Sequence, residues 1–486
     1  MLDFQTLHSQ YIDGSWREGK SSLQMENKNP YNDEVLASYQ AASKEDVDRA
    51  YQSAKQAQKN WGTVNPAVKR EIFEKAVLVI EEKHESIAQI ITKEIGGTRL
   101  KAEFEIGLVK NMLKEAATFP FRMEGKILPS VTDGKENRVY RVPVGVVGVI
   151  SPFNFPFFLS MKSVAPALAA GNGVVLKPHE HTVITGGTMI AKIFEEAGLP
   201  KGLLNVITTE ISEIGDAFVE HPIPKSISFT GSTQVGRHIG SVAGKHLKEV
   251  HLELGGNSGL IVLDDADLDL AVSAAVFSRF THQGQICMSA NRIIIHEAVY
   301  DNFVKKYLAK VSELTCGDPS DEKTIIGPLI NKKQVEVTSK LIEAGIKEGA
   351  NPLIKGEVRG NIVEPVVFGN VTKDMKIAKE EIFAPVVSLI KASNDQEIIE
   401  IVNDTTYGLS GAVHTQNIER GAQLAKQMET GMIHINDGTI NDEPNVAFGG
   451  MKNSGVGRLN GEWSLDAFTT TKWISIQHNR KQFPYS

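Results

Sequence analysis

The sequence predicts an α/β protein organised around a doubly wound, largely parallel sheet. Apolar strand-like and helix-like segments alternate from Val144 to Leu263, as expected for a sheet buried on both faces. A second alternation of the same kind begins beyond Asn257. A chain of 486 residues also exceeds one ordinary hydrophobic core, so we expect two or three domains.

Composition excludes several classes of protein. With 52 basic and 59 acidic residues, the net charge is −7. The chain therefore lacks the excess positive charge that is typical of proteins that bind nucleic acid or an anionic membrane. The first residues lack the order of a signal peptide, and no apolar run approaches a membrane span. Two cysteines argue against a disulfide framework and favour a reducing cytoplasm. We therefore expect a cytoplasmic protein with neither nucleic-acid nor membrane partners.

The segment before residue 120 is expected to be mostly helical after an irregular start around Trp16. Ser43-Lys-Glu-Asp46 has the pattern of a capping box, which predicts a helix to about Asn60. A second helix should follow Pro66, and a third should begin near Glu85.

The pattern then changes to that of an exposed strand at residues 138–142, after turn signals at Pro129 and Gly134. On these residues alone, the segment is as well explained by a lone surface hairpin as by any pairing with a distant strand.

Polar residues lie just past three strands of the first alternating region. The predicted strands are 144–150, 174–176, 203–207, 226–229 and 250–254, with helices between them. Asn154, Lys177 and Ser232 each follow a strand end. Ligands of doubly wound sheets bind at the carboxyl ends of the strands, so this placement predicts a nucleotide site.

The second alternating region predicts a helix at 267–282, a strand at 292–295, helices to 314 and from 332 to about 347, and strands near 366 and at 386–390. The glycine pair Gly255-Gly256 is the expected boundary between the two regions. Such a boundary would place Glu253 and Cys287 on opposite sides of a cleft, where small-molecule sites form.

Cys287 is the strongest candidate for a nucleophile. A random free cysteine is most often a small buried hydrophobe, and Cys316 is interpreted in that way. Cys287 differs because it follows Gln-Gly-Gln in a loop after a predicted helix. A thiol needs assistance to ionise at neutral pH, and Glu253, at a strand end between Leu252 and Leu254, could act as a base.

Six motifs in order resemble the NAD(P)-dependent aldehyde dehydrogenase superfamily. The spacing also matches the family, with 99 residues from Asn154 to Glu253 and 34 more to Cys287. The motifs are Phe-Asn154-Phe-Pro, Lys177-Pro-His-Glu180, Phe229-Thr-Gly-Ser232, Leu-Glu253-Leu-Gly-Gly, Gln-Gly-Gln-Ile-Cys287 and Glu381-Ile-Phe383-Ala-Pro.

The resemblance implies a Rossmann-like NAD-binding domain at 1–124 and 144–253 and an α/β catalytic domain at 254–469. It also implies a small β oligomerisation flap at 125–143 and 470–486, in which the strand near 138–142 joins the strand 473–477. A second copy of the chain is then the expected protein partner, in a homodimer or homotetramer.

The resemblance also implies the catalytic roles. Cys287 is the nucleophile, Asn154 and the Cys287 backbone N–H stabilise the oxyanion, and Glu253 activates water to release a free carboxylic acid. Without the resemblance, Glu253 would be an ordinary solvated or salt-bridged residue and Asn154 a turn residue.

The cofactor implied is NAD, with NADP left open because Lys177 could reach a phosphate. A carboxylate at Glu180 accepts hydrogen bonds from a ribose 2′-hydroxyl and repels a 2′-phosphate. No metal is expected. The implied cofactor-binding residues are Ser151, Pro152, Phe153, Lys177, Glu180, Phe229, Thr230, Gly231, Ser232, Leu254, Glu381 and Phe383.

Four apolar neighbours of the motifs are expected to wall the aldehyde tunnel: Phe155, Ile286, Met288 and Phe448. No basic residue in the matched segments is placed to hold a substrate carboxylate, so an aromatic aldehyde is favoured. The motifs look most like the benzaldehyde and vanillin dehydrogenase branch. The alternative is an aliphatic or semialdehyde dehydrogenase, of the succinate-semialdehyde kind.

Two other classes remain open: a thiol hydrolase or acyltransferase without a redox step, and a non-catalytic protein that keeps the fold. Leu459 stands where several relatives carry a proton-relaying glutamate, which puts a proton exit through that position in doubt.

Overall fold

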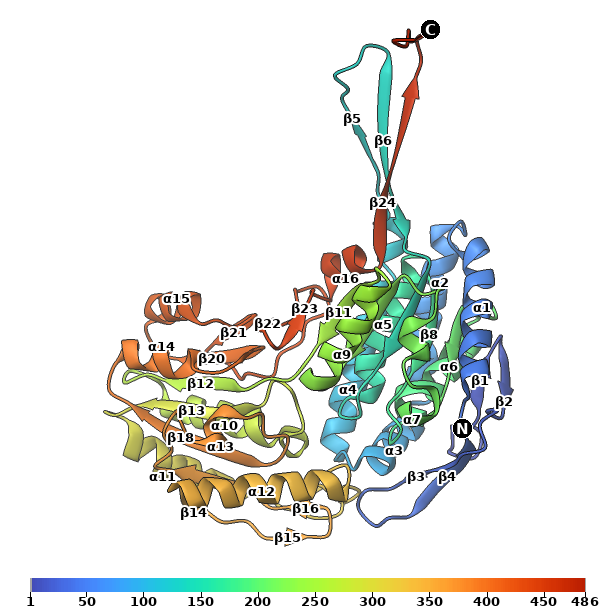
Figure 1. Cartoon of the computed structure of the whole chain (residues 1–486). Coiled ribbons are helices and arrows are strands. Elements are labelled where there is room, and N and C mark those ends of the chain that lie inside the picture. Colours follow the sequence, from blue (N-terminus) through green and yellow to red (C-terminus); the bar gives the residue numbers. More distant parts are fainter. Residues whose placement is uncertain (1, 486) are drawn as a thin grey trace.

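Two α/β units and a projecting β flap make up the computed structural model, which describes residues 2–485 (Figure 1). The first unit contains an eight-stranded sheet of order β2-β1-β9-β8-β7-β10-β11-β23. Its strands are β1 (Gln10–Ile12), β2 (Ser15–Arg17), β7 (Val146–Ile150), β8 (Gly173–Lys177), β9 (Leu204–Val206), β10 (Ser226–Thr230), β11 (Glu249–Glu253) and β23 (Gly455–Val456).

The central strands β9-β8-β7-β10-β11 are parallel, and their order reverses between β7 and β10. This is the order of a doubly wound sheet, which confirms the predicted fold class. Every residue of β8 and β9 is buried, because helices cover both faces of such a sheet. In doubly wound sheets, ligands bind at the carboxyl ends of the strands beside the reversal point, which here are β7 and β10.

Helices pack around this sheet, and the first three begin close to the predicted positions. The capping box of Ser43 and Asp46 is present at the start of α1, and α2 has Pro66 at its first position. The helices are α1 (Lys44–Trp61), α2 (Pro66–Glu82), α3 (His84–Ile95), α4 (Arg99–Ala116), α5 (Pro156–Ala169), α6 (Met189–Glu196), α7 (Ile211–Ile214), α8 (Ala217–Glu220), α9 (Thr233–Lys245) and α16 (Gly461–Ala467), with short turns η1 (Phe119–Phe121) and η2 (Ile184–Thr188).

The irregular start predicted before residue 43 is wrong. β1 joins the edge of the first sheet through Tyr11 and Val206, and β3 (Gln24–Lys28) pairs with β4 (Val35–Gln40). β1 and β2 are three residues long, too short to show an alternating pattern, and their partners are set by tertiary packing. β3 alternates in burial, but its buried residues are Met25 and the polar Asn27, so the sequence does not show the apolar alternation of a strand.

The second unit contains a seven-stranded sheet of order β14-β17-β18-β13-β12-β20-β21, parallel except at β14. The strands are β12 (Ser258–Val262), β13 (Ala290–His296), β14 (Asn351–Ile354), β17 (Val366–Gly369), β18 (Val386–Ala392), β20 (Ser410–His414) and β21 (Met432–Ile435). The helices are α10 (Leu268–Phe280), α11 (Tyr300–Val311), α12 (Lys332–Glu348), α13 (Lys376–Lys379), α14 (Asp395–Asn403) and α15 (Ile418–Gln427). Two small ribbons complete the unit: β15 (Val358–Arg359) with β16 (Ile362–Val363), and β19 (Tyr407–Gly408) with β22 (Met451–Lys452).

The proposed boundary after Glu253 lies between β11 of the first sheet and β12 of the second. The chain crosses back later, because β23 pairs antiparallel with β11 through Gly455 and Glu253. The C-terminal segment therefore contributes to both units, and the division at 254–469 stays a prediction.

The predicted pairing of the two distant flap segments is confirmed. β6 (Lys135–Pro143) pairs with β24 (Thr469–Gln477) along its whole length, with Val139 opposite Trp473, and β5 (Lys126–Leu128) adds a third strand. The flap projects away from both α/β units (Figure 1). Among the described residues, no helix combines the length and apolarity needed to span a membrane.

Candidate active site

Cys287 lies in a loop that leaves the second unit after α10 and the short turn η3 (Thr281–Gly284). The helix ends at Phe280, two residues before the predicted end, because His282 and Gln283 adopt positive φ values of 49° and 56°. This left-handed turn is unusual for residues other than glycine and redirects the chain toward the first unit. A Cβ on Gly256 would lie 2.1 Å from the Cys287 carbonyl oxygen, so the predicted glycine pair allows the loop to approach closely.

Asn154 follows β7 and lines the same cavity as Cys287. Its Nδ2 donates a hydrogen bond of 2.9 Å to the carbonyl oxygen of Gln285, two residues before the nucleophile. Because an amide nitrogen carries two hydrogens, one remains for a ligand in the cavity. The backbone N–H of Cys287 has no hydrogen-bond partner among residues 2–485. The structure thus brings together the two predicted oxyanion donors.

Glu253 is the last residue of β11 and is 6% exposed. Burial raises the pKa of its carboxyl group to about 8, whereas the charges of Lys162 and Arg458 oppose the increase. Its Oε2 atom has no hydrogen-bond partner within the described part of the chain. A Cβ on Gly449 would lie 2.9 Å from Oε1, so a glycine is required where the carboxyl group packs. Glu253 does not line the Cys287 cavity, but its charge acts on the thiol.

The environment does not favour the Cys287 thiolate. Burial raises the pKa of the thiol to about 12, and the carboxyl groups of Glu381, Glu253 and Asp442 raise it further, whereas Lys162 lowers it. An isolated buried thiol is therefore protonated at neutral pH. A base must remove the proton as the sulfur attacks, and Glu253, with its raised pKa, is suited to that task.

The predicted cofactor residues of the first unit gather at one edge of its sheet. Ser151, Lys177, Thr230 and Leu254 lie at or just past the carboxyl ends of four adjacent parallel strands, β7, β8, β10 and β11. The Ser151 N–H donates to the Lys177 carbonyl oxygen, and the Gly231 N–H donates to the Glu253 carbonyl oxygen. These bonds join the ends of β7 and β8 and the ends of β10 and β11, on either side of the reversal point of the sheet.

Ser232 caps α9, and its hydroxyl accepts a hydrogen bond from the Val235 N–H. The first amides of this 13-residue helix face a position suited to a phosphate. Lys177 is buried. Glu180 is partly exposed, and its Oε1 atom lies 3.7 Å from Nε2 of His179. A part-exposed carboxylate beside a buried ammonium fits the hydroxyls of an adenosine ribose.

Two predicted cofactor residues come from the second unit. Glu381 accepts a hydrogen bond of 2.8 Å from the Gly256 N–H, and burial raises its pKa to about 7. Phe383 packs edge-to-face against Phe153, with ring centroids 5.9 Å apart. Pro152 lies between Ser151 and Phe153 and is buried, and Phe229 is buried beneath Gly231. The residues present therefore fit a dinucleotide lying across the sheet edge.

The four predicted substrate residues all line the Cys287 cavity: Phe155, Ile286, Met288 and Phe448. Its other lining residues were missed from the sequence: Phe104, Leu108, Phe158, Leu159, Ile440 and Asp442. Phe158 and Leu159 lie three and four residues after Phe155, and Phe104 and Leu108 are four apart on α4, so helical periodicity could have identified these four. No periodic pattern in the sequence identifies Asp442 as a lining residue.

Lys162 was also missed. It lies on α5, is buried, and forms an ion pair of 2.6 Å with Asp442. Its Nζ lies 3.2 Å from the centroid of the Phe448 ring. A basic residue therefore stands close to the site, although an acidic partner balances its charge.

Leu459 pairs with Phe448 through two backbone hydrogen bonds, of 3.0 and 2.9 Å, and its side chain is buried. It has no group that could carry a proton away from Glu253.

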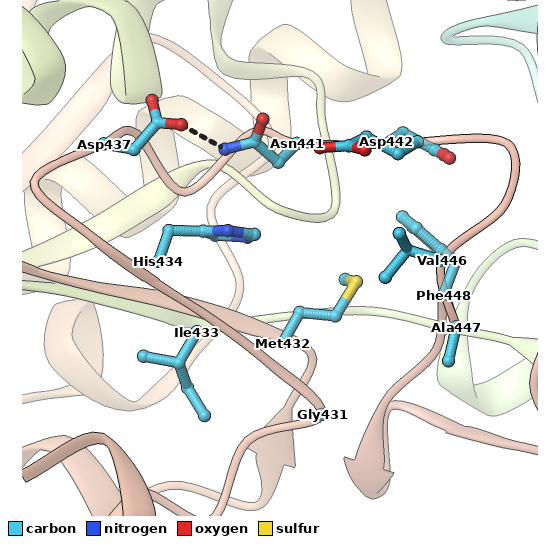
Figure 2. A pocket seen from close by; sticks show the side chains of 11 residues that line it. Gly431, Met432, Ile433, His434, Asp437, Asn441, Asp442, Val446, Ala447 and Phe448 are labelled. Carbon is cyan, nitrogen blue, oxygen red and sulfur yellow. Dashed lines mark hydrogen bonds between the residues drawn. The ribbon is translucent and has the colours of Figure 1, made fainter. Parts of the chain in front are cut away.

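A second, more polar pocket adjoins the Cys287 cavity, since Asp442 and Phe448 line both. Asp437, Asn441 and Asp442 lie along one side of it, facing His434 and Met432 (Figure 2). The Asn441 amide donates a hydrogen bond of 3.1 Å to Asp437.

Comparison with known proteins decides the family. The sequence profile of the aldehyde dehydrogenase family matches residues 16–474. The chain belongs to the aldehyde dehydrogenase family.

Similar relatives cover the full length of this aldehyde dehydrogenase. It is 64% identical over 485 residues to benzaldehyde dehydrogenase YfmT of Bacillus subtilis, covering 100% of both chains. It is 51% identical over 470 residues to vanillin dehydrogenase of Corynebacterium glutamicum, covering 96% of this chain and 97% of the relative. The crystal structure of an NAD-dependent benzaldehyde dehydrogenase from C. glutamicum superposes with a TM-score of 0.91 at 46% identity, covering 100% and 99% of the two chains.

Proposed function

We propose that this aldehyde dehydrogenase oxidises aromatic aldehydes, of the benzaldehyde and vanillin kind, to carboxylic acids with NAD. The observation that carries the proposal is the cavity holding Cys287 and Asn154, whose walls are apolar and rich in phenylalanine. Such walls suit a flat aromatic ring. Full-length similarity to a benzaldehyde and a vanillin dehydrogenase supports the same substrate class.

The first bond forms between the Cys287 sulfur and the aldehyde carbon. Glu253 takes the thiol proton, and the carbonyl oxygen becomes the oxyanion of a thiohemiacetal. The free N–H of Asn154 and the backbone N–H of Cys287 are the donors available to it. Removing one such donor costs about 3 kcal/mol of transition-state stabilisation in comparable sites.

Bound NAD would supply the acceptor for the hydride that leaves the former aldehyde carbon, and the sulfur then carries a thioester. Ser232, Lys177 and Glu180 from the first unit, with Glu381 and Phe383 from the second, are the residues proposed to hold it. The part-exposed carboxylate of Glu180 favours NAD over NADP.

Water completes the reaction. Glu253 first releases the thiol proton to solvent. It then accepts a proton from a water molecule, whose oxygen attacks the thioester carbon, and the sulfur leaves and takes up that proton, which restores the Cys287 thiol. Burial supports this role, because a pKa of about 8 makes Glu253 a stronger base than an exposed carboxylate.

We also propose that the flap joins copies of the chain in a homodimer or homotetramer. Three large apolar residues are exposed on the flap, which is costly for an isolated surface: Ile127, Val131 and Trp473.

We propose the reducing cytoplasm as the compartment, and the two free cysteines support it.

An aldehyde panel tests the proposal. Benzaldehyde, vanillin, hexanal and succinate semialdehyde are each followed by nicotinamide absorbance with NAD and with NADP. The highest kcat/KM is expected for an aromatic aldehyde with NAD. Cys287→Ala should abolish NAD reduction while NAD still quenches tryptophan fluorescence. Preference for succinate semialdehyde would refute the aromatic assignment, and thioester hydrolysis without any absorbance change with aldehydes would support a thiol hydrolase instead.

A further inference from the structure

Asp442 is the one charged side chain among the described residues that line the Cys287 cavity. Its carboxylate is held from two sides: Oδ2 accepts a hydrogen bond of 2.6 Å from Lys162 Nζ, and Oδ1 accepts one of 2.8 Å from Asn460 Nδ2. Only 5% of the side chain is exposed. A negative charge therefore has a fixed position in an otherwise apolar wall.

Lys162 does not line this cavity. Its ammonium group lies against the rings of Phe448 and Phe158, at 3.2 and 5.5 Å from their centroids, and both rings are part of the cavity wall. A ligand in the cavity therefore meets the carboxylate of Asp442 directly, whereas aromatic rings separate it from the balancing cation.

The adjoining pocket has charge of the same sign. Asp437 and Asp442 line it (Figure 2). Glu443 lines it as well, and no lysine or arginine does so among the described residues. Burial lowers the pKa of His434, so this histidine is neutral at pH 7. The residues that line the two adjoining pockets thus include carboxylates and, within the described part of the chain, neither lysine nor arginine.

We propose that Asp442, oriented by Lys162 and Asn460, makes the enzyme select neutral aldehydes and reject aldehydes that carry a carboxylate. The inference rests on the proposed function and narrows its substrate class. A carboxylate in the cavity would lose its hydration and face a like charge, and both effects weaken its binding. A neutral aromatic ring meets neither cost.

Alkylation of Cys287 tests this selectivity without aldehyde oxidation. Iodoacetamide and iodoacetate have nearly the same size and differ in charge, and mass spectrometry of the Cys287 peptide gives the rate for each. The ratio of the iodoacetate rate to the iodoacetamide rate is expected to be lower for Cys287 than for free cysteine. Asp442→Asn should raise that ratio by roughly tenfold. Any change in the reactivity of the thiol itself cancels in the ratio.

Matched variants complete the experiment. Glu336→Gln removes the same charge from an exposed position on α12 and should leave the ratio unchanged. The double variant Lys162→Met/Asp442→Asn leaves neither partner of the ion pair as an unpaired buried charge. It can therefore replace Asp442→Asn if that single variant does not fold. It should also raise the ratio of the iodoacetate rate to the iodoacetamide rate. An unchanged ratio in the folded Asp442 variant, or an equal increase in Glu336→Gln, would overturn the proposal.

Kinetics with benzaldehyde and 4-carboxybenzaldehyde separate this inference from the proposed function. The wild-type enzyme should prefer benzaldehyde, and loss of the Asp442 charge should narrow the difference in kcat/KM. If the wild type oxidised neither compound, the proposed function would fail, while the alkylation ratio would still decide whether Asp442 excludes anions.

Discussion

Replacing Lys162 with methionine should strongly destabilise the protein, and the structure gives the magnitude. The side chains of Lys162 and Asp442 are 2% and 5% exposed and 2.6 Å apart. Removing one partner of a buried ion pair costs about 3–5 kcal/mol, because the other charge is left without compensation. The methionine chain can keep packing against Phe448, so little apolar contact is lost. We expect the melting temperature to fall by roughly 10 °C, since about 1 kcal/mol corresponds to roughly 2–4 °C in a large domain.

The double variant Lys162→Met/Asp442→Asn separates charge from packing. It removes the unpaired carboxylate, so it should recover most of the lost stability in the same calorimetric scan. If the double variant melted no higher than Lys162→Met, the loss would come from packing and the argument from unpaired charge would be wrong. The single variant should also shift the pH profile of Cys287 alkylation upward, because the charge of Lys162 opposes the increase in the thiol pKa.

Three further predictions concern the base, its packing and the flap. Glu253→Gln should slow the burst of NADH, because Glu253 accepts the thiol proton, and should slow the subsequent turnover further, by about 10²–10⁴-fold, in rapid-mixing measurements. Equal loss of both phases would contradict a separate role in deacylation. In the wild type, a deacylation-limited rate should rise about tenfold per pH unit up to about pH 8 and then level off, because Glu253 acts in its deprotonated form. Gly449→Ala should slow the same phase, because its Cβ would meet both Glu253 and Arg458 at a φ of 150°, whereas Gly107→Ala, where nothing lies within 4 Å, serves as its control. Trp473→Lys on the exposed flap should lower the mass measured by light scattering, and an unchanged mass would argue against self-association through this strand.

The two-unit architecture could be predicted because its signals are local. Buried parallel strands consist of near-continuous apolar runs, so β7 and β8 appear in the sequence with a helix between them. The capping box at Ser43 and the proline opening α2 are likewise contained within a few residues. β1 and β23 could not be located in this way, because strands of two or three residues take their positions from distant partners.

The sequence by itself determined which residues could do chemistry, since Cys287, Glu253 and Asn154 stand in motifs whose residue types and spacing are visible without coordinates. Tertiary structure alone decided their surroundings. Lys162 and Asp442 are 280 positions apart, and only folding places them against Phe448 beside the nucleophile. Electrostatic energies depend on distance and burial in space. For that reason the raised pKa values of Cys287 and Glu253, and the negative wall of the cavity, belong to the folded molecule.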